Sequence, residues 1–222
     1  MFNRVKNCDE PSYEILSSSS SFELKEAYNS LCTNILYLPI MDKCKKIAIT
    51  SAVSGEGKTS VAANLSISLA RNLLDKKVLL VDADMRAPHV AQFMRDHIKK
   101  TEKTGLSDYL ADITSEPNIL GTDISNLDII LAGDSTNNPA GLICSEKMTS
   151  FISACEGKYD YVIFDTPPVN IVSDAILLIN KVNGYILATR TKYSKLPNIN
   201  TAQETLKSVG AQIFGIVLTD NK

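Results

Sequence analysis

The chain has 222 residues, 44% of them hydrophobic, and a formal net charge of −2. That is enough for one well-buried domain, and no stretch approaches the ~20 consecutive apolar residues that a membrane-spanning helix needs. The small net charge gives no reason to expect sequence-independent binding to nucleic acid, so we expect no nucleic-acid partner.

The first 21 residues contain Pro11 and a run of serines over 17–21, and they show no sustained apolar period. This pattern predicts a flexible N-terminal arm over 1–21 and one folded domain over 22–222. The arm also lacks the basic start and apolar stretch of a signal peptide. We therefore expect a cytoplasmic protein.

A helix is predicted over 22–38, because Leu24, Tyr28, Leu31 and Ile35 recur at steps of three and four residues, and Pro39 would end it. The short apolar run over 47–50 then predicts a buried strand. A second helical pattern covers 58–74 and a second apolar run covers 78–81.

Between the first strand and the second helix, residues 52–59 read Ala-Val-Ser-Gly-Glu-Gly-Lys-Thr. Glycines let backbone N–H groups turn inward onto a phosphate, and the following helix adds its positive end. This spacing predicts a phosphate-binding loop, although Ala52 replaces the usual first glycine and such a short match can also arise by chance. The residues expected to bind nucleotide are Ser54, Gly55, Glu56, Gly57, Lys58, Thr59 and Ser60.

Within that loop, Lys58 is expected to reach the β and γ phosphates of a nucleoside triphosphate. The hydroxyl of Thr59 is a suitable ligand for Mg²⁺, which prefers phosphate oxygens together with a few protein oxygens. The sequence therefore predicts ATP and Mg²⁺ as cofactors.

Two acids, Asp82 and Asp84, follow the second strand and point to the same side if strand geometry persists. One would orient a Mg²⁺-bound water, and the other would accept a proton from an attacking hydroxyl. The alternative is that these acids only cap a following helix.

Further apolar runs at 127–131, 161–164, 185–188 and 214–218 do not alternate with polar residues, which predicts strands buried on both faces. Strands of this kind, separated by helix-length segments, indicate an α/β fold with a doubly wound, mainly parallel sheet. Asp165 follows the 161–164 strand and is expected to hold Mg²⁺ with Thr59 and Asp82. Pro167 and Pro168 keep it at the strand tip.

These motifs resemble the bacterial protein-tyrosine kinases (BY-kinases) that regulate capsule and exopolysaccharide synthesis, a branch of the MinD/ParA-like P-loop ATPases. The segment Asp-Ala-Asp-Met-Arg over 82–86 is the most diagnostic. The resemblance extends over nearly the whole chain and also rests on the segments 26–28, 105–110, 138–139, 159–161 and 173–175. It implies a kinase site formed by Lys58, Asp82, Asp84 and Asp165.

A lysine that MinD- and ParA-type ATPases carry early in the loop is replaced here by Val53, which favours the kinase branch. Two other features depart from the kinase pattern. Asn29 and Cys32 stand where the family has arginines that link subunits into a ring, so a homo-oligomer is possible but ring assembly is expected to be weak or absent. The family's tyrosine-rich tail is also missing, since the last tyrosine is Tyr193. Either such a tail lies outside this sequence, or the protein does not autophosphorylate in the usual way.

The leading hypothesis is a cytoplasmic ATP-dependent protein-tyrosine kinase with protein tyrosines as substrates. By resemblance to kinases whose catalytic domain is a separate chain, we expect a membrane-spanning adaptor whose cytoplasmic tail docks near the nucleotide site and holds the kinase at the inner membrane surface. The alternatives are a non-kinase regulatory ATPase or nucleotide-dependent binding module, and a P-loop enzyme that acts on a small molecule.

Overall fold

A computed structural model describes residues 14–98 and 104–220 of the chain. Its helices are α1 (Phe22–Leu36), α2 (Lys58–Asn72), α3 (Val90–Phe93), α4 (Leu106–Leu110), α5 (Pro139–Cys144), α6 (Glu146–Glu156) and α7 (Leu196–Ser208), with a 3-10 turn η1 (Ile176–Leu178). Its strands are β1 (Lys45–Ser51), β2 (Val78–Asp82), β3 (Ile119–Gly121), β4 (Leu127–Ile130), β5 (Tyr161–Asp165), β6 (Gly184–Arg190) and β7 (Ile213–Thr219).

Within the described residues the strands form one sheet in the order β3-β4-β2-β5-β1-β6-β7. Every neighbouring pair is parallel except β3 with β4, which is antiparallel. This arrangement confirms the expected α/β fold. It also places the carboxyl ends of β2, β5 and β1 side by side, at the edge where parallel sheets bind ligands.

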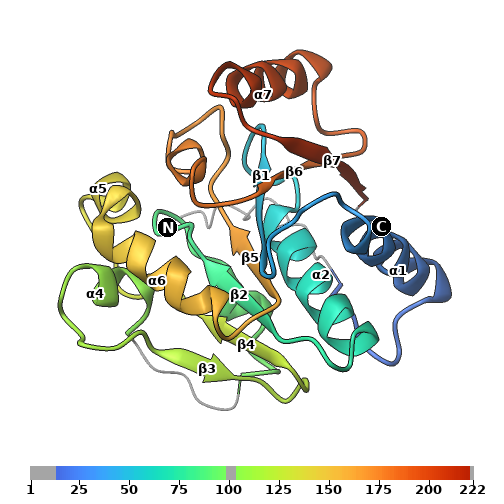
Figure 1. Cartoon of the computed structure of the whole chain (residues 1–222). Coiled ribbons are helices and arrows are strands. Elements are labelled where there is room, and N and C mark those ends of the chain that lie inside the picture. Colours follow the sequence, from blue (N-terminus) through green and yellow to red (C-terminus); the bar gives the residue numbers. More distant parts are fainter. Residues whose placement is uncertain (1–13, 99–103, 221–222) are drawn as a thin grey trace, which may run out of the picture.

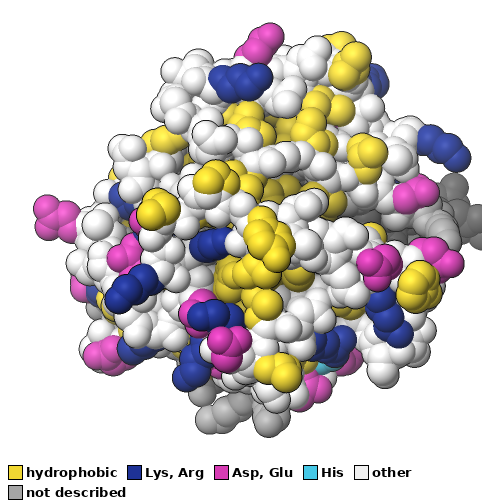
Figure 2. Space-filling model, turned by 45° about the vertical axis from the view of Figure 1, so that its right-hand side comes forward, with side chains coloured by type: hydrophobic (Ala, Val, Ile, Leu, Met, Phe, Trp, Pro, Cys, Tyr) yellow, Lys and Arg dark blue, Asp and Glu magenta, His cyan; other side chains and the backbone are white. Residues whose placement is uncertain are grey.

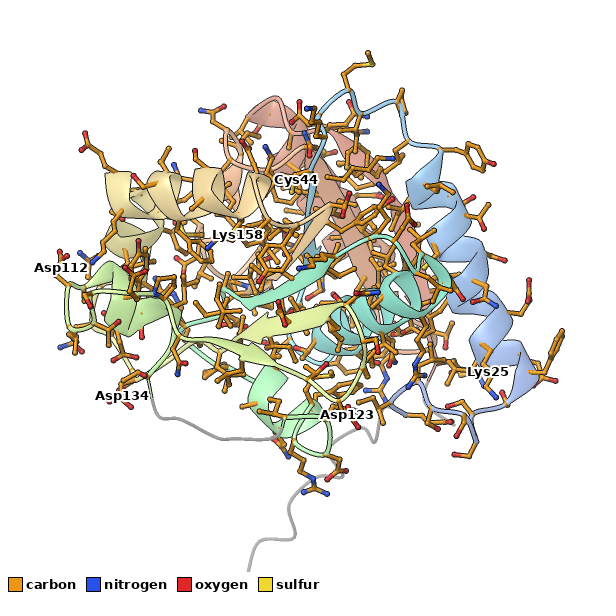
Figure 3. All side chains as sticks on the ribbon, turned by 60° about the horizontal axis from the view of Figure 1, so that its bottom comes forward. Lys25, Cys44, Asp112, Asp123, Asp134 and Lys158 are labelled. Atoms are coloured by element: carbon orange, nitrogen blue, oxygen red, sulfur yellow. The ribbon has the colours of Figure 1, made fainter. Side chains whose placement is uncertain are left out.

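Helices cover both faces of the sheet (Figure 1). Successive strand residues point to opposite faces, so Ile47 and Ile49 of β1 pack with α1 and α2, while Ala48 packs in a second core cluster with α5, α6 and α7. Side chains fill the layers on both sides of the sheet (Figure 3). The central strands are therefore buried on both faces, as their unbroken apolar runs predict.

The expectation of burial on both faces is wrong for β7, which lies at the edge of the sheet. Ile216 is 43% exposed and Leu218 is 72% exposed. Figure 2 brings this side of the molecule forward and shows apolar side chains gathered across its middle. An apolar run predicts a strand, but it does not say whether a helix covers each of its faces.

A second difference is β3, a three-residue strand that no apolar run indicated. It pairs with β4 through the register Ile119 to Ile130, Leu120 to Ile129 and Gly121 to Asp128. So short an edge strand carries too few residues to show a period. The sheet therefore has an antiparallel edge that sequence reasoning missed.

At the N-terminus, α1 begins after Ser21, whose hydroxyl accepts a hydrogen bond from the backbone N–H of Leu24. The helix ends at Leu36, two residues before the predicted end at residue 38. Ahead of it, the backbone N–H of Leu16 donates to Asn64 Oδ1 of α2 at 2.7 Å, and Leu16 is buried. Residues 14–16 of the expected arm thus contact α2, and residues 1–13 lie outside the described residues.

None of the helices in the described part of the chain combines the length and the apolar character needed to cross a lipid bilayer.

Candidate active site

The loop between β1 and α2 has the backbone that phosphate binding requires. Gly55 and Gly57 adopt φ angles of 80° and 85°, a region that residues with a Cβ rarely occupy. Gly57 is also the N-cap of α2 and offers no side-chain hydrogen bond to the first helical turn. The first N–H groups of this 15-residue helix therefore point into the loop without a capping side chain.

Three aspartates converge beside this loop from two neighbouring strands. Asp82 is the last residue of β2 and Asp165 the last of β5, and they pair directly across the two parallel strands. Asp84 follows two residues after Asp82. All three carboxylates are buried. The expectation that the strand-end acids lie together is therefore met by the geometry.

Lys58 lies between these acids. Its Nζ is 2.8 Å from Asp84 Oδ2 and 3.8 Å from Asp165 Oδ1. Burial by itself lowers the pKa of Lys58, but the nearby carboxylates of Asp165 and Asp84 outweigh it and leave this pKa raised. The ammonium group thus stays charged. The neighbouring Thr59 hydroxyl donates to Asp165 Oδ2 at 2.6 Å, which ties the start of α2 to the end of β5.

Each acid at the end of β2 uses one oxygen for local structure. Asp82 Oδ2 accepts the backbone N–H of Val90, the first residue of α3, at 3.2 Å. Asp84 Oδ1 accepts the backbone N–H of Ala87 at 3.1 Å. The capping alternative therefore describes one oxygen of Asp82, while Asp84 Oδ1 braces the turn before α3. The site interpretation concerns the other oxygen of each carboxylate.

Two buried carboxylate oxygens in the site, Asp82 Oδ1 and Asp165 Oδ1, have no hydrogen-bond partner. Burial raises the pKa of Asp82 well above its usual value, and the adjacent charge of Asp165 raises it further. Burial likewise raises the pKa of Asp165, although Lys58 and the Thr59 hydroxyl oppose the shift. Two adjacent buried acids, each with one oxygen that lacks a hydrogen bond, provide a negative site that a cation would stabilise.

These oxygen ligands suit a metal ion that also takes ligands from a bound phosphate or from water. No group of three or more His, Cys, Asp and Glu side chains in residues 14–98 and 104–220 is arranged to hold a metal alone. Mg²⁺ is commonly bound by one or two carboxylates plus phosphate oxygens and water. Thr59, Asp82 and Asp165 fit that pattern.

The remaining loop residues named from the sequence have different environments. Glu56 is buried, with Oε2 accepting the Val53 N–H at 2.9 Å and Oε1 accepting from the Ser194 hydroxyl. Ser60 lies beside α1, where its carbonyl accepts from Tyr28 Oη at 3.4 Å. Of the groups of Glu56 and Ser60, only the backbone N–H groups remain as possible contacts to a phosphate.

Four residues that sequence reasoning missed hold the loop from the side of β6 and β7. Tyr193 Oη donates to the Ser54 carbonyl at 3.1 Å, and Arg190 NH1 donates to the Gly55 carbonyl at 3.5 Å. Thr219 Oγ1 donates to the Glu56 carbonyl at 2.9 Å, and Ser194 binds the Glu56 carboxylate. These contacts join residues more than 130 positions apart, so no local pattern in the sequence indicates them.

Comparison with known proteins agrees with this geometry. A protein-family model described as an AAA domain matches residues 44–213. The chain is 36% identical over 214 residues to the tyrosine-protein kinase CpsD of Streptococcus pneumoniae serotype 4, a match that covers 94% of this chain and 90% of the relative. It is 34% identical over 200 residues to the tyrosine-protein kinase YwqD of Bacillus subtilis, covering 89% and 81%.

Solved structures show the same relationship. The chimerical protein CapA2B2 superposes with a TM-score of 0.80 at 30% identity, covering 89% of this chain and 84% of the other. The kinase domain of the Escherichia coli tyrosine kinase ETK gives a TM-score of 0.78 at 28% identity, covering 88% and 75%. The septum site-determining protein MinD of Pyrococcus horikoshii, complexed with Mg-ADP, gives 0.62 at 27% identity, covering 79% and 70%.

Proposed function

Because the chain belongs to the family of bacterial tyrosine-protein kinases built on an AAA domain, we infer that it is an ATP-dependent protein-tyrosine kinase. It transfers the γ-phosphoryl group of ATP to the hydroxyl of a protein tyrosine. By the family resemblance, this activity regulates capsule and exopolysaccharide synthesis. Membership of this family implies nucleotide binding. The roles of the individual residues are our proposal.

We propose one task for each residue of the site. The N–H groups of the loop around Gly55 and Gly57 bind the phosphates, and Lys58 contacts the β and γ phosphates. Thr59, Asp82 and Asp165 hold Mg²⁺, which when bound neutralises charge on the phosphate oxygens. A strand-end aspartate, Asp82 or Asp84, accepts the proton that the tyrosine hydroxyl loses as it attacks.

One observation carries this assignment. Two oxygens without a hydrogen bond, Asp82 Oδ1 and Asp165 Oδ1, lie in fully buried carboxylates next to a charged lysine and the positive end of a helix. An isolated domain gains no stability from such an arrangement, since like charges and desolvation both oppose it. The arrangement becomes favourable when a cation and a polyphosphate share the site.

The direct test is transfer of label from γ-labelled ATP to tyrosine, with a tyrosine-containing protein or peptide as acceptor. Lys58→Met should lower the transfer at least ~100-fold, because the phosphates lose a preorganised cation. Lys158→Met is a matched control, since Lys158 is exposed and lies between α6 and β5, near the amino end of that strand (Figure 3). ATP hydrolysis without any labelled tyrosine would instead support a regulatory ATPase.

A membrane-spanning activator is the partner we propose. Its cytoplasmic tail would dock beside the nucleotide site and bring the kinase to the inner membrane surface. This rests on the family resemblance. The test compares tyrosine labelling with and without a candidate tail peptide, and equal activity in both reactions would contradict the split arrangement.

We propose that this chain does not form a stable ring. Asn29 Oδ1 accepts a hydrogen bond from Asn72 Nδ2 of α2 at 2.8 Å, and Cys32 is buried, which raises the pKa of its thiol. Both positions therefore face α2 and neither offers a charged fork to another subunit. Sedimentation of the nucleotide-bound protein should give a small species, and a stable octamer would overturn the proposal.

A further inference from the structure

A second ion pair lies outside the acids already described and links two loops at the same end of the sheet. Arg86, in the loop between β2 and α3, donates from Nε to Asp174 Oδ2 at 2.7 Å and from NH2 to Asp174 Oδ1 at 2.9 Å. The pair is bidentate, which fixes the orientation of both groups. The Asp174 side chain is fully buried, whereas Arg86 is 42% exposed.

Asp174 belongs to a turn that a residue of the central sheet holds in place. Tyr185, a buried residue of β6, donates from its hydroxyl to the Ala175 carbonyl at 2.8 Å. The Ser173 carbonyl accepts the N–H of Ile176 at 2.8 Å, which closes the turn. Asp174 is therefore fixed to the central sheet, and its carboxylate is an anchor rather than a free surface charge.

The other end of the link reaches the proposed kinase site. Arg86 lies two residues after Asp84, whose Oδ1 accepts the N–H of Ala87 and whose Oδ2 contacts Lys58. Residues 86–89 are exposed, so packing does little to hold them. Among the described residues, the side chains of 84–89 make two ion pairs to other segments: Asp84 to Lys58, and Arg86 to Asp174.

We propose that Arg86 is a positioning residue for phosphoryl transfer. The bidentate ion pair of its guanidinium group with Asp174 holds the loop that contains Asp84. It thereby fixes the Asp84 carboxylate against Lys58. This inference rests on the proposed kinase function and names one determinant of its geometry. Arg86 contacts neither nucleotide nor substrate in this role, and it acts through the loop backbone.

The chemistry of the pair explains why arginine is needed. A buried carboxylate without a partner is strongly unfavourable, so Asp174 requires a cation as its ion-pair partner. A lysine would supply the charge but not the two parallel N–H donors that set the loop's direction. Misplacing a catalytic group by about 1 Å can lower turnover by up to ~100-fold.

The experiment compares Arg86→Lys and Arg86→Gln with Arg95→Gln as the matched control. Arg95 is an exposed arginine after α3 that forms an ion pair with its neighbour Asp96. We expect both Arg86 variants to lower kcat for tyrosine labelling about 10- to 100-fold while KM for ATP changes less than about twofold. Arg86→Lys should retain more activity than Arg86→Gln, and Arg95→Gln should match the unchanged protein.

A second measurement is independent of activity. Hydrogen exchange at the Ala87 and Val90 amides, which donate to Asp84 and Asp82, should become faster in both Arg86 variants. The amides of β5 should keep their rates. Faster exchange throughout the sheet, or unchanged exchange at Ala87 and Val90, would show that Arg86 is not a positioning residue.

The two proposals fail in different ways. An active unchanged protein whose Arg86 variants keep full kcat would overturn the positioning role and leave the kinase function intact. A protein that never labels tyrosine would overturn the kinase function, and the exchange rates would still decide whether Arg86 holds the loop. Should Arg86→Gln not fold, Arg86→Lys alone decides, because it preserves the charge that buried Asp174 needs.

Discussion

The phosphate-binding loop lies between two unlike sides of one sheet edge. On the side of β2 and β5, the buried carboxylates of Asp82 and Asp165 each leave one oxygen without a hydrogen-bond partner. On the side of β6 and β7, both oxygens of the buried Glu56 carboxylate accept hydrogen bonds. All four acids are buried, but Asp82 and Asp165 each keep one oxygen without a hydrogen bond, whereas both oxygens of Glu56 are hydrogen-bonded.

This difference separates a site from its support. The β2–β5 side stores unfavourable electrostatics that a bound cation and polyphosphate would relieve, which is typical of functional sites. The β6–β7 side holds the loop in shape through Ser194, Thr219 and Tyr193. Changes on the first side should therefore alter activity more than stability, and changes on the second should do the reverse.

The largest expected effect is on the β2–β5 side. Asp82→Asn should lower tyrosine labelling by about 100- to 10,000-fold, because it removes a metal ligand or the general base. The same change should raise the free energy of unfolding without nucleotide by about 1–2 kcal/mol, since a buried charge beside Asp165 disappears. Labelling assays and thermal melts measure the two effects. A variant that loses both activity and stability would break the comparison.

The next effect is on the β6–β7 side. Ser194→Ala leaves one oxygen of the buried Glu56 carboxylate without its donor and should cost about 1–3 kcal/mol of unfolding free energy. That corresponds to a fall of about 2–12 °C in melting temperature for a domain of this size. Ser208→Ala, which removes a local bond at the exposed end of α7, is the control and should change little. Unchanged melting of Ser194→Ala would mean that Glu56 does not brace the loop.

The pH dependence of stability should distinguish the two sides further. The pKa of Asp82 is raised in the folded protein, so its protonated form is favoured by folding. Stability from this group is complete below the unfolded pKa of about 3.9 and is lost as pH rises through the raised folded value. The gain from Asp82→Asn should thus be close to zero near pH 4 and grow toward neutral pH. Nucleotide-free melting curves at several pH values measure it, and a gain that stays flat would contradict the raised pKa.

The smallest expected effect is that of Thr219→Val at the end of β7. The Thr219 hydroxyl donates to the Glu56 and Thr189 carbonyls, and its loss should cost about 0.5–1.5 kcal/mol. Nucleotide affinity should fall only slightly, because the Glu56 side chain keeps its own partners. Titration of ATP binding alongside thermal melts would show it. A large loss of affinity with normal stability would make Thr219 part of the site rather than its support.

The sequence indicated which residues of the β2–β5 side lie together. Glycines 55 and 57, Lys58 and the strand-end aspartates have fixed spacings within short segments, and parallel strand order brings their carboxyl ends together. The support on the other side had no such signal. Ser194 meets Glu56 across 138 positions, and Arg86 meets Asp174 across 88, and in a single sequence these residues look like ordinary loop residues.

The burial of a strand on both faces was likewise predictable only for strands in the middle of the sheet. The apolar runs of β1, β2 and β5 lie in the middle of the sheet and are buried on both faces, as expected. The equally apolar run of β7 lies at the edge and leaves Leu218 exposed. Strand order decides this outcome, and it depends on pairings that the runs themselves do not encode.

The pairing of Asp82 with Asp165 across β2 and β5 also has an evolutionary consequence. If each carboxylate weakens the bare fold while serving catalysis, selection for turnover and selection for heat resistance act against each other at these two codons. A descendant protein that no longer needs phosphoryl transfer would accumulate asparagine or apolar residues at these two positions before it loses the glycines of the phosphate-binding loop. Surveying inactive relatives for that order of loss would reveal whether such a conflict has shaped the lineage.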